Sequence, residues 1–321
     1  MLKTQSAIAR GEIMILTVCM SPSVDVTIEL DSLNIGKVNI VKNKTLSFTG
    51  KAINVAIGVA RLGAQAYATG FMYNENGAMF ESALDKEGVG FSFVWNSGRV
   101  RENYKCIDQK SMLTEINDVG GRVGDEKLVE LLQMIRNFSS RSDVTVISGG
   151  LPRGVDASYY RELFKAVDDK SLKIADTEGA KMFAALEAGI DLVKPNLEEM
   201  QDTLGRELRD KDDMLQGCRE FLDRGAKIVL LSLGKDGAVI TDGHKNYYCK
   251  SLKVAVNSTV GAGDGMVAAA ATMLQQGAPL PEILRAGVAA GTATVTTFGT
   301  ISFTKNKYDE ILSGLDVTEF S

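Results

Sequence analysis

From about residue 53 onward, short apolar segments rich in β-branched residues alternate with longer segments whose apolar positions follow a helical period. The short segments predict strands at residues 13–18, 66–71, 144–148, 173–176, 191–194, 228–232 and 238–241. The longer segments predict helices at residues 53–62, 78–87, 125–138, 157–167, 180–188, 197–204, 210–224, 264–276 and 280–297. This alternation is typical of a doubly wound, mostly parallel α/β sheet with helices on both faces.

Two segments, residues 26–48 and 91–116, interrupt the alternation. They contain period-two strings such as Val38-Asn39-Ile40-Val41 and Asn103-Tyr104-Lys105-Cys106-Ile107, which are typical of extended strands. Both emerge beside predicted strand ends, so we expect them to pair into a small β-sheet lid over the cleft. The expected division is an α/β core of residues 13–25, 49–90 and 117–321, a β lid of residues 26–48 and 91–116, and an N-terminal extension of residues 1–12.

The overall charge and the rarer residues exclude several classes of function. The 321 residues include 36 Lys and Arg against 41 Asp and Glu, a net charge of −5 that disfavours broad contact with nucleic-acid phosphates. The apolar run at residues 13–20 is too short to cross a membrane. The four cysteines are widely spaced, which favours a reducing cytoplasm over disulfides or a zinc site. The one histidine, His244, lies in a turn-like string and no G-x-S-x-G motif accompanies it, so hydrolase triads are not expected.

The segment Gly261-Ala262-Gly263-Asp264, followed by an alanine-rich stretch, is the strongest candidate for chemistry. Its small residues allow a tight turn, and the free N–H groups and dipole of the following helix attract an anion such as a phosphoryl group. Asp264, in the first helical turn, could accept a proton from an alcohol as a general base. An acid in this position also favours the helix itself, so the motif alone leaves both interpretations open. The chain has neither a Walker A loop nor a dinucleotide-binding fingerprint.

Several motifs together resemble those of the ribokinase-like (pfkB-type) sugar kinases, over nearly the whole chain. Besides the segment at residues 261–264, residues 21–25 are similar to the family's Asn-Pro-Ser-x-Asp, and residues 49–56 to its Gly-Gly-Lys-Gly-Ile-Asn-Val-Ala. Residues 148–155 resemble Ser-Gly-Ser-Leu-Pro-Pro-Gly-Val, and residues 194–199 and 231–237 also fit the family. Residues 114–117 and 258–261 resemble the phosphosugar branch, which contains 1-phosphofructokinase and tagatose-6-phosphate kinase.

The resemblance implies a set of residues for phosphoryl transfer. It makes Asp264 the base, and it places the anion hole at Gly261, Ala262 and Gly263. Asn196 and Glu199 match an Asn-x-x-Glu motif that orders Mg²⁺ through water, although the same spacing is that of a capping box. The implied ATP-binding residues are Lys194, Asn196, Ser232, Gly234 and Gly237.

The sugar site is also implied by the resemblance. Asp25, Gly50 and Asn54 match positions that approach the sugar, and Lys37, Lys51 and Arg101 match basic positions that would hold its phosphate. The chain departs from the family at Ile40, which replaces an arginine, and at Thr49 and Ala52, which replace glycines. A lost cation and two added side chains beside the sugar are expected to alter which phosphosugar fits.

These motifs lead us to expect a phosphosugar kinase that uses ATP and Mg²⁺ and acts on fructose 1-phosphate. Tagatose 6-phosphate is the alternative substrate, and a non-catalytic sugar-phosphate sensor is the alternative of another class. By analogy with the family we also expect a homodimer formed through the lid, and a monovalent cation such as K⁺ near Thr294, Thr297 and Gly299. No nucleic-acid or membrane partner is expected.

Overall fold

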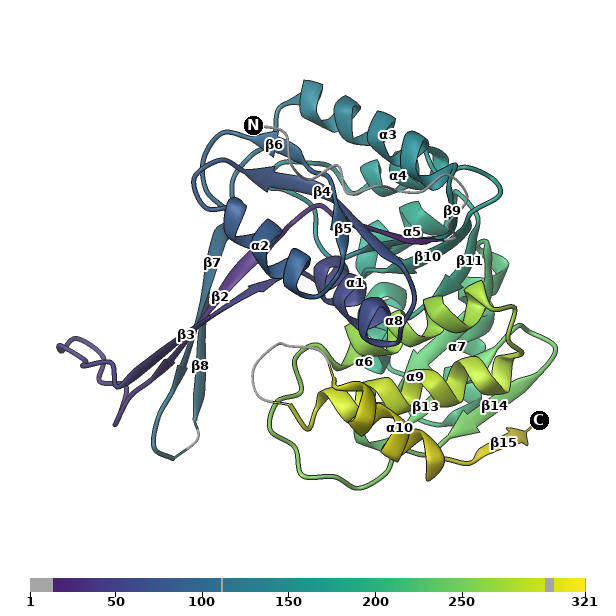
Figure 1. Cartoon of the computed structure of the whole chain (residues 1–321). Coiled ribbons are helices and arrows are strands. Elements are labelled where there is room, and N and C mark those ends of the chain that lie inside the picture. The colour runs from purple at the N-terminus through teal and green to yellow at the C-terminus, as the bar shows by residue number, and fades with distance from the viewer. Residues whose placement is uncertain (1–13, 111, 298–302, 321) are drawn as a thin grey trace.

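The centre of the computed structural model, which describes residues 14–110, 112–297 and 303–320, is an 11-stranded sheet (Figure 1). Its strands are β1 (Met14–Cys19), β4 (Ala66–Tyr73), β5 (Gly90–Phe91), β6 (Val94–Asn96), β9 (Ser142–Ser148), β10 (Leu172–Asp176), β11 (Ile190–Val193), β12 (Ala226–Ser232), β13 (Ala238–Thr241), β14 (Asn246–Cys249) and β15 (Val317–Phe320). They follow the order β15-β14-β13-β12-β11-β10-β9-β1-β4-β5, and β6 also pairs with β4. Pairs from β12 to β5 are parallel, whereas β12 to β15 pair antiparallel.

Helices cover both faces of this sheet. One face carries α1 (Lys51–Arg61), α2 (Ala78–Lys86), α8 (Ala262–Gln275), α9 (Leu280–Thr294) and α10 (Lys305–Ser313). The other face carries α3 (Asp125–Ser139), α4 (Tyr159–Lys165), α5 (Gly179–Leu186), α6 (Leu197–Leu204) and α7 (Lys211–Asp223). The central strand β1 is buried on both sides, because Ile15 and Cys19 pack into the first layer and Leu16 and Val18 into the second. The predicted doubly wound α/β core is confirmed.

A second, smaller sheet projects from one edge of the core (Figure 1). Its strands are β2 (Ser23–Glu29), β3 (Asn43–Thr49), β7 (Arg101–Ile107) and β8 (Leu113–Asn117), in the order β3-β2-β7-β8. This sheet is the expected β lid, although its boundaries differ from the expected ones. It begins at Ser23, and residues 94–96 belong to the large sheet because they pair with β4. Residues 38–41, expected to be extended, pair with no described strand and are largely exposed, and residues 1–12 lie outside the described part.

Small residues set the distance between α8 and α9, the two helices behind the candidate motif. A Cβ atom added at Gly265 would lie 2.6 Å from Thr294 Oγ1 and 3.1 Å from the carbonyl oxygen of Ala290. We therefore expect Gly265→Ala to push the helices apart and to lower the free energy of unfolding by about 1–3 kcal/mol. Gly287→Ala is the matched control, because its added Cβ would have its nearest neighbour at 3.6 Å. Urea denaturation measures both, and equal stabilities would contradict this packing.

None of the described helices is long and apolar enough to span a bilayer.

Candidate active site

A cavity of about 1100 Å³ lies between the lid and the carboxyl ends of the central parallel strands. Strands β1, β9, β10 and β12 end at this cavity with Cys19, Ser148, Asp176 and Ser232, and α8 begins there. Open α/β sheets bind their ligands at this edge because the strand order reverses there and leaves a crevice. The lid contributes residues of β2, β7 and β8 to the other wall.

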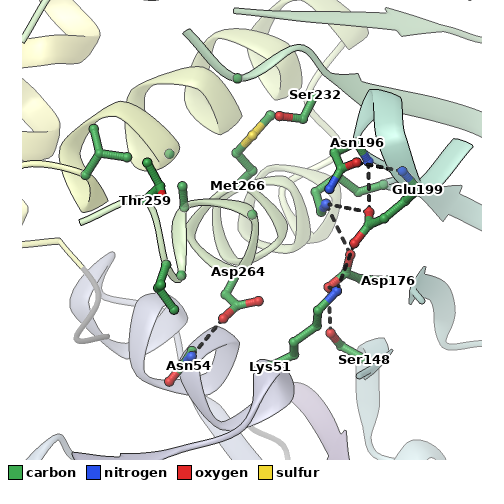
Figure 2. A pocket seen from close by; sticks show the side chains of 18 of the residues that line it. Lys51, Asn54, Ser148, Asp176, Asn196, Glu199, Ser232, Thr259, Asp264 and Met266 are labelled. Carbon is green, nitrogen blue, oxygen red and sulfur yellow. Dashed lines mark hydrogen bonds and ion pairs between the residues drawn. The ribbon is translucent and has the colours of Figure 1, made fainter. Parts of the chain in front are cut away.

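The N-terminus of α8 places Asp264 in the cavity (Figure 2). Gly261, the N-cap, has a φ of 84°, a left-handed conformation that glycine adopts without strain. One turn later Asp264 is buried, and its Oδ2 accepts a hydrogen bond of 2.7 Å from Asn54 Nδ2. Burial, aided by the negative charge of Asp176, raises the pKa of Asp264 to about 7, against the opposing effect of Lys51 and the Asn54 hydrogen bond. A carboxyl group with such a pKa is suited to accept a proton near neutral pH.

A cluster of four charged side chains lies beside Asp264 (Figure 2). Lys194 Nζ is 3.1 Å from Asp176 Oδ1, and Lys51 Nζ is 3.6 Å from Asp176 Oδ2 and 3.2 Å from Glu199 Oε1. A Cβ atom added at Gly263 would lie 3.3 Å from Lys194 Nζ, so this ammonium group lies close to the first turn of α8. Two cations and the positive end of a helix dipole therefore converge on one region of the cavity, as a transferring phosphoryl group requires.

The carboxylate of Asp176 holds this cluster together. Burial would raise its pKa, but the charges of Lys194 and Lys51 and the hydrogen bond from Ser148 Oγ, at 2.8 Å, outweigh burial and lower the pKa to about 2. Asp176 in turn raises the pKa of Lys51 above its usual value. The residue is therefore a charged anchor for both lysines across the pH range in which proteins are normally studied.

Asn196 and Glu199 form the capping box that their spacing allowed. Asn196 Oδ1 accepts a hydrogen bond from the Glu199 backbone N–H at 2.7 Å, and Glu199 Oε2 accepts one from the Asn196 N–H at 2.9 Å. Within the described residues there is no group of three or more His, Cys, Asp or Glu side chains placed to hold a metal. One or two carboxylates at a nucleotide site still fit Mg²⁺, which keeps most of its waters and takes further oxygens from phosphates.

The residues implied for ATP also line the cavity. Ser232, Gly234 and Gly237 belong to its wall, as do several apolar side chains. Gly237 has a φ of 98°, and an added Cβ atom would lie 2.0 Å from the carbonyl oxygen of Cys249, so glycine is required at this turn. The apolar residues in the wall include Leu233, Leu252, Val254, Val256, Val288 and Val295.

The residues implied for the sugar are only partly brought together. Asp25, Gly50, Asn54 and Arg101 line the cavity, as expected. Lys51 also lines it, but its ammonium group is turned toward Asp176 and Glu199, the side implied for ATP and metal. Lys37 does not line the cavity: it is exposed, in the segment between β2 and β3 that projects from the lid (Figure 1). Its expected role is therefore not met within this chain.

The three departures from the family lie differently from what we expected. Ala52 is fully buried in the core and Ile40 is exposed in the lid, and neither is among the residues that line the cavity. Thr49 does line it, but its hydroxyl is occupied, because Thr49 Oγ1 is 3.0 Å from Ser23 Oγ. Ala52 thus adds no side chain beside the sugar, because its position on α1 faces the protein interior.

Asn103, Lys105 and Asp176 also line the cavity but belong to none of the motifs. Asn103 and Lys105 follow Arg101 at spacings of two in β7, and this period-two pattern predicts a strand without indicating a site. Asp176 ends the predicted strand β10, and a carboxylate at that sheet edge was the available signal.

The residues implied for a monovalent cation are only partly within the described residues. Thr294 Oγ1 donates to the Ala290 carbonyl at 2.8 Å, and Thr297 Oγ1 donates to the Thr294 carbonyl at 2.8 Å. Gly299 lies outside the described residues.

The doubly wound core, the β lid and the buried carboxylate at a helix N-terminus agree with the sugar phosphotransferase that the sequence motifs imply. The sequence matches the pfkB family carbohydrate kinases over residues 17–307, and the chain belongs to this family.

Relatives with assigned activities agree with this class. The chain is 29% identical over 286 residues to a 1-phosphofructokinase of Vibrio cholerae, covering 89% of this chain and 90% of that protein. It is also 29% identical over 283 residues to a 1-phosphofructokinase of Borreliella burgdorferi, covering 88% and 91%. Among solved structures, phosphofructokinase-2 of Escherichia coli in complex with potassium superposes with a TM-score of 0.89 at 30% identity, covering 94% of this chain and 99% of that one.

Proposed function

We propose that the protein transfers the γ-phosphoryl group of ATP to fructose 1-phosphate, giving fructose 1,6-bisphosphate and ADP. The observation that carries the proposal is the position of Asp264, buried in the first turn of α8 with Lys51 and Lys194 close by. The two 1-phosphofructokinase relatives support a phosphosugar as the acceptor. An intact base beside an anion site favours catalysis over the alternative of a sugar-phosphate sensor, because a binding protein needs no base there.

The side chains that line the cavity have different roles in the proposed reaction. Asp264 accepts the proton of the attacking hydroxyl, and Asn54 fixes the orientation of its carboxylate. The N–H groups of Gly261, Ala262 and Gly263 stabilise negative charge on the transferring phosphoryl group, together with Lys51 and Lys194. This assignment moves Lys51 from the sugar phosphate to the transferring group, because of its contacts with Asp176 and Glu199.

ATP and Mg²⁺ are the proposed cofactors. Glu199 and Asn196 would hold Mg²⁺ through water, and the ion supplies charge neutralisation between the nucleotide phosphates. Lys194, Ser232, Gly234 and Gly237 would border ATP, with its base against the apolar wall of the cavity. We also propose that K⁺ binds near Thr294 and Thr297, which the E. coli phosphofructokinase-2 in complex with potassium supports.

A homodimer through the lid is also proposed, and the apolar surface of the lid supports it. Ile35 is 93% exposed, Val38 90%, Ile40 78% and Ile116 59%, which is unusual for residues of this size. Analytical ultracentrifugation tests the proposal, and a protein that sediments as a monomer at micromolar concentration would contradict it.

The proposed activity is tested by measuring ADP release with ATP and Mg²⁺. The acceptors to compare are fructose 1-phosphate, tagatose 6-phosphate, fructose 6-phosphate and free fructose. We expect fructose 1-phosphate to give the highest kcat/KM, at or above about 10⁴ M⁻¹ s⁻¹. A higher kcat/KM with tagatose 6-phosphate would make that sugar the substrate. Binding of a sugar phosphate without turnover would mean that the protein is a sensor.

The fall of kcat/KM on the acidic side of its pH profile should reflect protonation of Asp264. Below the pKa of about 7 its carboxyl group is protonated and cannot accept the hydroxyl proton, so kcat/KM should rise with pH through about 7. The substrate phosphate also titrates in this region, so Asp264→Asn is the control. Its residual kcat/KM should lack the ionisation of Asp264 and keep only that of the substrate. A residual profile with the same fall on the acidic side as wild type would contradict the assignment.

A further inference from the structure

We propose that Tyr160 is a positioning residue for phosphoryl transfer, which acts on Lys51 through the backbone of Gly149. The inference rests on the proposed function, and it adds a fully buried side chain that is not among the residues lining the cavity. Two observations carry it. The carbonyl of Gly149 accepts hydrogen bonds from two buried hydroxyl groups, and the same residue lies beside the stem of the Lys51 side chain.

Gly149 follows the last residue of β9 and lies in the wall of the cavity. Its φ of 102° is a conformation that glycine adopts without strain. Its N–H donates to the backbone carbonyl of Asp176 at 3.0 Å, and Ser148 Oγ donates to the carboxylate of the same residue at 2.8 Å. The end of β9 is therefore bound to the residue that anchors both lysines.

The carbonyl of Gly149 is held from the protein interior. Its oxygen accepts hydrogen bonds from Tyr160 Oη at 2.5 Å and from Thr177 Oγ1 at 3.2 Å. Tyr160 has no exposed surface and Thr177 is 2% exposed, and a hydrogen bond in such surroundings is stronger than one in water. Burial also raises the pKa of Tyr160 above its usual value, so the hydroxyl keeps its proton and remains a donor.

The core fixes the position of the Tyr160 hydroxyl. Tyr160 lies in the first turn of α4, and its ring packs in the second core layer with Phe164, the two ring centroids being 6.4 Å apart. The hydrogen bond to Gly149 therefore connects a rigid helix to the cavity wall.

Gly149 in turn supports Lys51. A Cβ atom added at Gly149 would lie 3.5 Å from Lys51 Cβ and 3.9 Å from Lys51 Cγ, so the glycine backbone borders the stem of this side chain. Asp176 and Glu199 hold the ammonium group at the other end. A lysine side chain has many rotamers, and holding it in one direction requires contacts along its length. If Gly149 moves, the ammonium group of Lys51 loses its fixed direction toward the transferring phosphoryl group.

Tyr160→Phe tests the inference, because it removes the hydroxyl and keeps the packed ring. We expect kcat to fall about 3- to 30-fold, since Lys51 is no longer held in the reactive geometry. The KM values for fructose 1-phosphate and ATP should change by less than about twofold, because the loss concerns the transition state. Steady-state ADP release with ATP, Mg²⁺ and fructose 1-phosphate measures these constants.

Tyr159→Phe is the matched control. Tyr159 Oη donates to the Leu128 carbonyl at 2.7 Å, and neither residue lines the cavity. Both variants lose one hydroxyl that bonds to a backbone carbonyl, so both should lower the melting temperature. Only Tyr160→Phe should lower kcat at a temperature well below melting.

The second donor to Gly149 gives a further comparison. Thr177→Val removes the other hydroxyl and should also lower kcat. Thr177→Ser keeps the hydroxyl, and its kcat should remain within about twofold of the wild-type value.

A double-mutant cycle tests whether the effect passes through Lys51. In the Lys51→Met background, Tyr160→Phe should change kcat by less than about twofold, because the group that Tyr160 positions is absent. A general loss of folded protein would lower turnover by the same factor in both backgrounds.

The outcomes distinguish this inference from the proposed function. Wild-type protein that phosphorylates none of the phosphosugars would overturn both. Active wild-type protein with the same kcat for Tyr160→Phe as for Tyr159→Phe would overturn only the positioning role. An effect of Tyr160→Phe that is equally large with and without the Lys51 side chain would overturn it too.

Discussion

Asp264→Asn is expected to lower kcat by about 10²- to 10⁴-fold, because asparagine cannot accept the proton of the attacking hydroxyl. The fold should persist, since asparagine has nearly the same shape and retains a hydrogen-bonding oxygen facing Asn54. Above pH 7 the variant should be at least as stable as wild type, because it no longer buries a carboxylate whose burial raises its pKa to about 7. Steady-state ADP release and thermal denaturation measure the two effects.

Two comparisons make this experiment decisive. Asp85→Asn removes an exposed carboxylate in α2 and should leave turnover unchanged. Titration calorimetry should show that Asp264→Asn still binds ATP and the sugar, since the loss concerns the transition state. Turnover above about a tenth of the wild-type value would mean that another group takes the proton.

Asp176→Asn is expected to destabilise the protein by about 3–5 kcal/mol at pH 7, since it leaves the buried ammonium group of Lys194 without its nearest counter-ion. The pKa of Asp176 is lowered to about 2, so its stabilising contribution is present above about pH 4 and is lost as pH falls toward 2. The difference between wild type and variant should therefore shrink on acidification. Urea denaturation at pH 7 and pH 3 measures it.

The matched control for Asp176→Asn is Glu130→Gln, which breaks an exposed ion pair with Lys127. Such pairs contribute at most about 1 kcal/mol, because solvent screens them and both side chains lose freedom. If the two variants were equally stable, Asp176 would not anchor the lysines. We also expect Asp176→Asn to reduce turnover, because Lys51 and Lys194 would no longer be held beside the phosphoryl group.

The core was predictable because its signals are local. Apolar runs of four to eight residues gave the parallel strands, and α6 was predicted with its observed ends, because its capping box is visible in the sequence. The β15 edge of the large sheet and the helix before it could not be predicted in this way. Strand β15 and helix α10 were missed because their polar, exposed positions give little periodic signal, and β15 exists only through its pairing with β14.

In the candidate site, too, local features could be predicted from the sequence, whereas contacts between distant residues could not. The helix start at residues 261–264 lies within one short segment, and so its geometry followed from spacing alone. The direction of the Lys51 side chain could not be predicted in this way. It depends on Asp176 and Glu199, which are more than a hundred residues away in the chain. Residues 38–41 alternate like a strand but pair with no strand in the described part of the chain, so the alternation marks an exposed apolar surface of the lid.

The two sheets contribute different parts of the cavity. Asp25, Asn103 and Lys105 belong to the small sheet, whereas Asp264, Asp176 and Lys194 belong to the core. Under the proposed function the acceptor contacts one sheet and the base belongs to the other. A substitution that changed the angle between the two sheets would therefore lower turnover even where every hydrogen bond within each sheet is kept.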